Sequence, residues 1–425
     1  MNPPQDHPVS PWLLAAVAAL MVAVTFGSRS ALGLFVSPLN TATGIGVAGI
    51  GLAMAIGQLA WGASQPGIGL LAERYGVRPV VLFGGLLLGC GMAAIPWAHG
   101  AGALAIALAL GAIGAAAAGS QSLLLATVNC RMPAQHRSLA IGIVGAGGSA
   151  GQLLLAPLSQ ALMSTFGWIV AINALAALAL LAVPASRLFP GRASVAAADL
   201  RTPARAAVQA AGADAGDATS LGAALRKPRY WSVTAAFFVC GFHVTLLLSH
   251  MPGVIESCGL PLSLAGTWLA IVGACNIASS VLAGMLIRRF SSRNLLAGLY
   301  AARAIGVAAF LLAPKTEAVM IAFALAMGLT YMATLAPTVA TISALVAPAR
   351  LATLLGVTML IHQIGAFFGA WLGGLLFDLT GDFSAVWLVN IGLTLVAVAA
   401  SVAPHSDRLL VDSGQRKPQA LILRS

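Results

Sequence analysis

Charged side chains are scarce in this sequence. Only 8% of the 425 residues are Asp, Glu, Lys or Arg, whereas 59% are hydrophobic, and the mean hydropathy is +0.94. In soluble domains about a quarter of the residues are charged. This chain therefore has too few polar side chains to cover a surface that faces water. The composition excludes a soluble globular protein and indicates an integral membrane protein.

Other chemistry is also missing. The five cysteines, an odd number, provide no disulfide framework. The chain contains neither HExxH nor GxSG and no pair of aspartates within an apolar run, so nothing supplies the metal or the nucleophile of an intramembrane enzyme. The net charge of +11 comes from basic residues that are scattered among loops, which argues against a nucleic-acid partner. We therefore expect no enzyme, no cofactor and no metal.

Long apolar runs, in contrast, fill most of the chain. About twenty apolar residues span a bilayer as a helix, and twelve runs are long enough. They are residues 12–36, 46–70, 79–98, 103–129, 139–163, 168–186, 230–250, 263–287, 295–313, 319–346, 353–376 and 385–403.

The predicted helices fall into two groups of six. Residues 188–229 are charged and rich in Ala and Gly, without an apolar face, and predict a cytoplasmic linker. We therefore predict an all-α membrane protein with an N-terminal lobe at 1–187, a C-terminal lobe at 230–405 and a tail at 406–425. The lobes repeat at an offset of 214 residues, at which Gly27, Arg29 and Pro38 correspond to Gly241, His243 and Pro252. Such a duplication is typical of two-lobed transporters with a site at the midplane.

The basic residues predict the orientation. With a cytoplasmic N-terminus, 19 of the 22 Lys and Arg residues lie on the cytoplasmic side. The exceptions are Lys315 in an outer loop and Arg29 and Arg303 within spans; we expect a structural role for Arg303. The sequence thus predicts a multi-pass protein of the cell membrane with both termini cytoplasmic, and we expect it to work as a monomer in the bilayer.

A glycine-rich loop joins the second and third predicted helices. In GLLAERYGVR, residues 69–78, the pattern is carried by Gly69, Glu73, Arg74, Gly76 and Arg78. It resembles the loop signature of the major facilitator superfamily, in which the acid is usually Asp. The resemblance implies a two-lobed transporter in which this acid pairs with an Arg or a helix end of the other lobe and so gates access. The alternative is a charged turn that only enforces topology.

Arg29 lies within the first apolar run, where an arginine costs about 3 kcal/mol or more. No acid is available within the spans to relieve this cost. The eleven acids are in tails, loops or helix ends: Asp6, Glu73, Asp199, Asp214, Asp217, Glu256, Glu317, Asp378, Asp382, Asp407 and Asp412. Two explanations are left, namely that Arg29 reaches toward the interface or that it binds an anionic substrate in a water-filled cavity; we favour the second.

The segment RSALGLF, residues 29–35, resembles the first helix of the monocarboxylate and oxalate/formate transporter group. That group carries a basic residue at the position of Arg29, which implies binding of substrate and proton there. The monocarboxylate transporters have an Asp and, four residues later, an Arg in the eighth helix, where this chain has Asn276 and Ser280. The lysine of the eleventh helix in oxalate exchangers corresponds to His362 or Gln363.

Intramembrane histidines are candidates for the missing proton carrier, because imidazole titrates near neutral pH. His243, the repeat partner of Arg29, and His362 are the candidates, while His250 borders a loop in the predicted span; the alternative is a neutral histidine bonded to a helix carbonyl. Further polar residues of the spans, which include Gln58, Asn276 and Tyr331, either line the cavity or join helices. The predicted substrate site comprises Arg29, Gln58, His243, Asn276, Tyr331, His362 and Gln363.

Together these features predict a secondary transporter that carries a small organic anion, such as a monocarboxylate, by alternating access. Uptake with a proton is the expected coupling. The alternative is proton-coupled export of drug-like or other small metabolites, which would not need Arg29. The sequence leaves open which acid is carried and in which direction.

Overall fold

The computed structural model describes residues 10–191, 221–346 and 348–403. Within these ranges the chain is almost entirely helical, with no β-strand and one isolated bridge between Gly76 and Gly191. Twelve helical segments are long and apolar enough to span a membrane. The predicted all-α class and the twelve spans are therefore confirmed. Most of the predicted linker and the predicted tail lie outside the described residues.

The N-terminal lobe contains six spans, several of which consist of more than one helix. Its elements are α1 (Pro11–Ser30), η1 (Ala31–Phe35), α2 (Val36–Thr43), α3 (Val47–Tyr75), α4 (Val77–Ala94), η2 (Ile95–Trp97), α5 (Ala101–Ala118), α6 (Gln121–Arg131), η3 (Ala134–His136), α7 (Arg137–Phe166), α8 (Trp168–Ala179), α9 (Ala182–Ala185) and η4 (Ser186–Leu188).

The C-terminal lobe contains the other six spans. Its elements are α12 (Leu221–Leu225), α13 (Pro228–Ser257), α14 (Ser263–Leu286), α15 (Ser292–Leu312), α16 (Glu317–Tyr331), η6 (Met332–Thr334), α17 (Leu335–Ser343), α18 (Pro348–Thr380) and α19 (Ser384–Val402).

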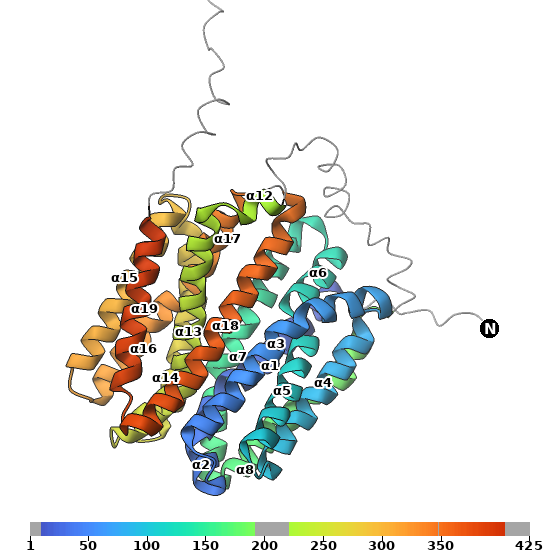
Figure 1. Cartoon of the computed structure of the whole chain (residues 1–425). Coiled ribbons are helices and arrows are strands. Elements are labelled where there is room, and N and C mark those ends of the chain that lie inside the picture. The colour runs from blue at the N-terminus through green and yellow to red at the C-terminus, as the bar shows by residue number, and fades with distance from the viewer. Residues whose placement is uncertain (1–9, 192–220, 347, 404–425) are drawn as a thin grey trace, which may run out of the picture.

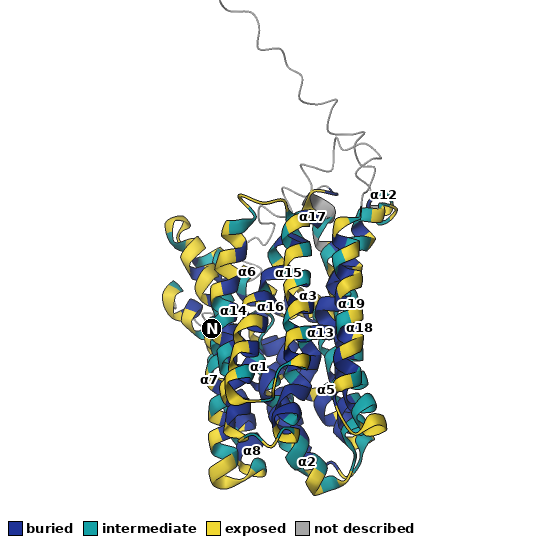
Figure 2. Ribbon diagram, turned by 90° about the vertical axis from the view of Figure 1, so that its left-hand side faces the viewer, coloured by how far each residue is buried: buried dark blue, intermediate teal, exposed yellow. Residues whose placement is uncertain are grey.

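Figure 1 shows the two lobes side by side, with the first lobe in blue to green and the second in yellow-green to red. We call the end of the bundle at which α12 lies the linker side, and the opposite end, with α2 and the start of α8, the far side. Figure 2 shows exposed residues along the outer helices of the bundle, and many of the exposed residues are large and apolar. Leu70, Ile106 and Leu312 are 67%, 64% and 89% exposed, as expected for a surface that faces lipid.

Two helices run beyond their predicted ends. The first span continues past Pro38 to Thr43, because the chain tightens into the 3-10 turn η1 and resumes as α2. Helix α13 continues through Pro252 to Ser257, so His250 lies inside a helix and not at its border. A proline is tolerated in such helices where neighbouring helices satisfy the freed carbonyl.

The lobes meet along two seams, α3 with α18 and α7 with α14, and where η1 packs against α13. Backbones touch toward the far side: a Cβ atom at Gly51 would lie 2.7 Å from the carbonyl oxygen of Ala370. Toward the linker side, by contrast, a Cβ atom at Gly69 or Gly356 would meet nothing within 4 Å. The lobes therefore diverge toward the linker side, and the structure is open on that side.

Candidate functional site

Arg29 lies in the last turn of α1, just before the 3-10 segment η1. Its guanidinium stays within the bundle, where it stacks over the indole of Trp61 at 4.3 Å from the ring centroid. One Nη2–H donates a hydrogen bond to Oε1 of Gln58. Both partners are on α3, three residues apart and thus on one helix face. The side chain is held inside the lobe and does not extend along α1 toward the far side.

Two residues of the second lobe approach this group. Tyr331, at the end of α16, is close enough to Arg29 for an electrostatic interaction. Gln363 of α18 lies over Gly62, the residue of α3 that follows Trp61. A Cβ atom at Gly62 would collide with the side chain of Gln363. Gln58 of the first lobe and Tyr331 of the second therefore lie close to Arg29, and Gln363 contacts α3 one residue after Trp61. That these residues bind substrate stays a prediction.

A hollow of about 400 Å³ borders the second lobe between α14 and the tenth span. It is lined by Ser280, Met332, Leu335, Ala336, Val339 and Ala340. The tenth span is broken there, because η6 separates α16 from α17. The fourth span is interrupted at the repeat-equivalent place, between Ala118 and Gln121. Broken helices beside a cavity are a recurrent feature of transporter binding sites.

His362 is on α18 and faces α13. Its ring lies 4.5 Å from that of Phe237, between centroids, and it interacts with the thiol of Cys240. Its Nδ1 atom has no hydrogen-bond partner within the described part of the protein. The side chain is partly exposed, so a proton can reach it more easily than a fully buried ring.

The other two histidines are enclosed in the second lobe. His243 is 1% exposed, and its Nδ1 lies 2.9 Å from Nδ2 of Asn390 on α19. His250 is 2% exposed and its Nε2–H donates to the carbonyl oxygen of Ala370 at 2.8 Å. The structure thus directs His243 toward α19, and it does not bring His243 together with Arg29.

Asn276 takes part in the second seam between the lobes. Its Nδ2–H donates to Oε1 of Gln152 on α7 at 3.2 Å. Both side chains are 0% exposed, and among the described residues Asn276 Oδ1 and Gln152 Nε2 have no partner. The pair is a buried polar contact between the lobes in the seam of α7 with α14, whereas the partners of Arg29 are on α3.

Arg303 is fully buried in the second lobe, at 0% exposure. Its Nη2 donates to the carbonyl oxygens of Thr330 and Tyr331 at 2.5 and 2.9 Å. These are the last carbonyls of α16, directly before the break at η6. Arg303 therefore supports the broken tenth span, which is the structural role expected for it.

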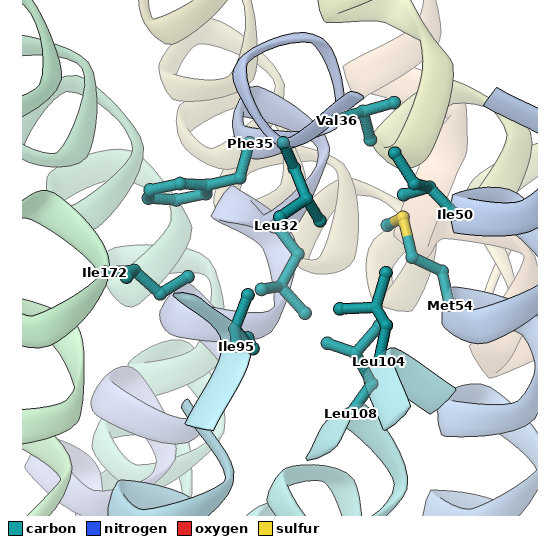
Figure 3. Close-up of a pocket in the computed structure, with 10 residues that line it drawn as sticks. Leu32, Phe35, Val36, Ile50, Met54, Ile95, Leu104, Leu108 and Ile172 are labelled. Carbon is teal, nitrogen blue, oxygen red and sulfur yellow. The ribbon is translucent and has the colours of Figure 1, made fainter. Parts of the chain in front are cut away.

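A second cavity lies inside the first lobe, and Figure 3 shows that apolar side chains surround it. It is lined by Leu32, Phe35, Val36, Leu39, Ile50, Met54, Ile95, Leu104, Leu108 and Ile172. Its volume of about 20 Å³ has room for roughly one water molecule. Without polar groups and with so little space, it is not a site for an organic anion. No cluster of three metal-binding side chains occurs in the described ranges either.

The sequence matches the family model of the Major Facilitator Superfamily over residues 18–326 and 255–423. The chain belongs to the major facilitator superfamily. Among its relatives, mouse monocarboxylate transporter 11 is 30% identical over 411 residues, which cover 89% of this chain and 83% of the relative. The oxalate:formate antiporter of Oxalobacter formigenes is 23% identical over 252 residues, 59% of this chain and 56% of the antiporter.

Solved structures agree on the fold. The crystal structure of a D-xylose-proton symporter superposes with a TM-score of 0.75 at 18% identity and covers 94% of this chain and 99% of the symporter. A nucleoside transporter, NupG, superposes with a TM-score of 0.72 at 14% identity, over 92% of this chain and 99% of that protein. Membership in this superfamily makes the protein a multi-pass membrane transporter and not an enzyme, as the sequence predicted.

The superfamily signature joins α3 to α4 on the linker side. Gly76 ends α3 with φ of +92°, a conformation that suits glycine alone. Glu73, Arg74 and Arg78 have exposed side chains, and the N–H of Arg78 donates to the carbonyl oxygen of Pro190 at 3.1 Å. This loop is thus tied to the segment that leaves the first lobe, and its acid points to solvent. Whether it gates transport stays a prediction.

Trp61 is the site residue that sequence reasoning missed. It appeared as one more aromatic residue of an apolar helix, whereas in the structure it covers one face of the Arg29 guanidinium. One signal was available. Trp61 follows Gln58 by three residues, so any helix that presents Gln58 to a cation presents an indole beside it.

Proposed function

We propose that the protein is a secondary transporter that carries a small organic monoanion, of the monocarboxylate class, by alternating access. One observation carries the proposal most directly. Arg29 places a guanidinium inside the bundle against a neutral amide and an aromatic ring, while the described acids lie at helix ends or in loops. A cation kept at this cost without a countercharge is suited to bind an anion.

The geometry favours a single carboxylate. Gln58 occupies one N–H of the guanidinium and Trp61 covers one face, which leaves other N–H groups for a bidentate contact with one carboxylate. Tyr331 approaches from the second lobe and would complete the site when the lobes close. The apolar hollow along η6 and α17 suits a short hydrocarbon tail. The names of the two relatives, a monocarboxylate transporter and an oxalate:formate antiporter, support the same class.

The proposal includes orientation and coupling. The linker side is the cytoplasmic side, because basic residues such as Arg74, Arg131 and Arg289 gather in its loops. For a coupled proton we favour His362 over His243, since the side chain of His362 is partly exposed whereas that of His243 is 1% exposed. His243 is buried against Asn390 and would need local opening to exchange a proton.

Binding of short carboxylates to variants of Arg29 tests the proposal. Purified wild type, Arg29→Lys and Arg29→Gln are compared by scintillation proximity with labelled acetate, lactate, pyruvate and oxalate, followed by counterflow in proteoliposomes. We expect Arg29→Gln to express but to lose about tenfold or more in affinity, because a charged hydrogen bond contributes about 1.5–3 kcal/mol. Arg29→Lys keeps the charge without the fork and should retain weak binding.

Lys315→Gln is the matched control. This variant removes a cation whose ammonium group contacts backbone carbonyls at the end of α15, and it should bind like wild type. Equal affinities of wild type, Arg29→Lys and Arg29→Gln for every acid that binds would rule out Arg29 as the anion site.

A further inference from the structure

The superfamily signature has a counterpart at the other end of the bundle. Residues 69–76 read GLLAERYG and residues 374–381 read GLLFDLTG. In both, Gly-Leu-Leu is followed by an acid at the fifth position and a glycine at the eighth. The two segments end α3 and α18, and the closing glycines, Gly76 and Gly381, have φ of +92° and +79°.

These helices are neighbours from different lobes and run in opposite directions. Helix α3 begins on the far side and ends on the linker side, whereas α18 ends on the far side, and the two pack along the first seam. Each helix therefore carries an acid two residues before its own end, close to the end at which its neighbour begins. Glu73 belongs to the linker side and Asp378 to the far side.

Asp378 makes a contact that bridges the lobes. Its Oδ2 accepts a hydrogen bond from the N–H of Ala48 at 2.9 Å. Ala48 is in the first turn of α3, whose N–H groups lack helical partners. The N-cap residue of α3 is Gly46, which offers no side chain to accept these bonds. A carboxylate of the second lobe thus occupies the place of the N-cap of a helix in the first, where the helix dipole also favours a negative charge.

The backbone brings Asp378 to this place. Gly374, one turn earlier on the same face of α18, lies against the start of α3, where its Cβ atom would be 2.5 Å from the carbonyl oxygen of Val47. Gly69 stands in the same relation to Glu73, but the space beside it is open, and the Glu73 carboxylate makes no hydrogen bond or ion pair with the described residues. One end of the helix pair is closed through its acid while the other is open.

A second carboxylate joins the lobes on the far side. Oε1 of Glu256, near the end of α13, accepts a hydrogen bond from the hydroxyl of Ser37 in α2 at 2.9 Å. The other far-side acid with a described partner, Asp382, stays within its own lobe, where it accepts a hydrogen bond from the N–H of Ser384, the first residue of α19, at 2.7 Å. Asp382 therefore provides a matched control for Asp378.

We propose that Asp378, assisted by Glu256, is a far-side latch that is reciprocal to Glu73 and holds the transporter open toward the linker side. When the far side opens, the start of α3 moves away from Asp378 and the bond to Ala48 breaks. The superfamily latch at Glu73 then acts at the opposite end of the same helix pair. The inference does not depend on the proposed anion, because it concerns the conformations of the empty protein.

Spin-label distances test this directly. In a background without native cysteines, a far-side pair, Ala42→Cys with Leu262→Cys, reports far-side opening. A linker-side pair, Gln135→Cys with Asn294→Cys, reports the other end; all four positions are exposed. With no substrate present, we expect Asp378→Ala to raise the far-side-open population about two- to fivefold, the loss expected for one exposed carboxylate at a helix N-terminus. Adding Ser37→Ala should raise the population further.

Two controls define the result. Asp382→Ala removes a carboxylate that accepts from a helix N–H within one lobe and should leave both distance distributions unchanged, whereas Glu73→Gln should lower the far-side-open population. Should Asp378→Ala fail to fold, Asp378→Asn keeps the shape, weakens the bond by removing the charge, and should shift the population in the same direction. Unchanged distributions in the folded Asp378 variants, or an equal shift in Asp382→Ala, would overturn the proposal.

Discussion

Gln58 offers the sharpest test of how the Arg29 site is organised. In the structure the side chain of Gln58 is already hydrogen-bonded, because its Oε1 accepts a hydrogen bond from the Arg29 guanidinium. Gln58→Leu removes this acceptor and keeps a side chain of similar size on α3. If the amide orients Arg29, the variant should weaken binding of the anion although the cation is still present.

The expected magnitude follows from the contacts of Arg29. A hydrogen bond to a charged group contributes about 1.5–3 kcal/mol, and since Arg29 is partly exposed we take the lower limit, which corresponds to roughly tenfold in Kd. The stacking on Trp61 at 4.3 Å remains in the variant and contributes about 0.5–1 kcal/mol. Gln58→Leu should therefore raise Kd by about tenfold, less than Arg29→Gln.

A double-mutant cycle separates orientation from direct contact. Kd for the carboxylate that binds best is measured by scintillation proximity for wild type, Gln58→Leu, Arg29→Lys and the double variant. If Gln58 acts through the Arg29 fork, its replacement should have little further effect in the Arg29→Lys background. A full tenfold loss in that background would mean that Gln58 contacts the substrate itself, and the reasoning from the hydrogen bond would be refuted.

Two further predictions concern groups away from Arg29. If His362 carries the coupled proton, His362→Gln should flatten the pH dependence of proteoliposome uptake between pH 5 and 8, while His243→Gln should leave the profile in place; the opposite result would assign the proton to His243. Asn276→Leu should lower the free energy of unfolding by about 1–3 kcal/mol by leaving Gln152 buried without a partner, and adding Gln152→Leu should restore much of it. Thermal unfolding in detergent measures the stability of the single and the double variant. A double variant that is less stable than Asn276→Leu would contradict the role given to the Asn276–Gln152 hydrogen bond.

Most of the fold could be predicted from the sequence. Twelve apolar runs, the scarcity of charge and the 214-residue repeat predicted the two six-helix lobes, since a bilayer admits only segments that satisfy their own backbone hydrogen bonds. The cost of one arginine in such a run singled out Arg29 for the same reason. The apolar runs and the cost of Arg29 depend only on how each residue interacts with lipid. Because lipid is a uniform environment, these inferences do not require knowing which residues lie next to one another in the fold.

Contacts between segments distant in the chain were decided by the tertiary structure alone. His243 and Arg29 match in the repeat, but packing turns His243 toward Asn390 and Arg29 toward Gln58. In the sequence, Asp378 was one of several loop acids, and only the antiparallel packing of α3 and α18 places it over the N–H of Ala48. A periodic pattern states which face of a helix is polar, whereas the partner on that face depends on how the helices of the two lobes pack together.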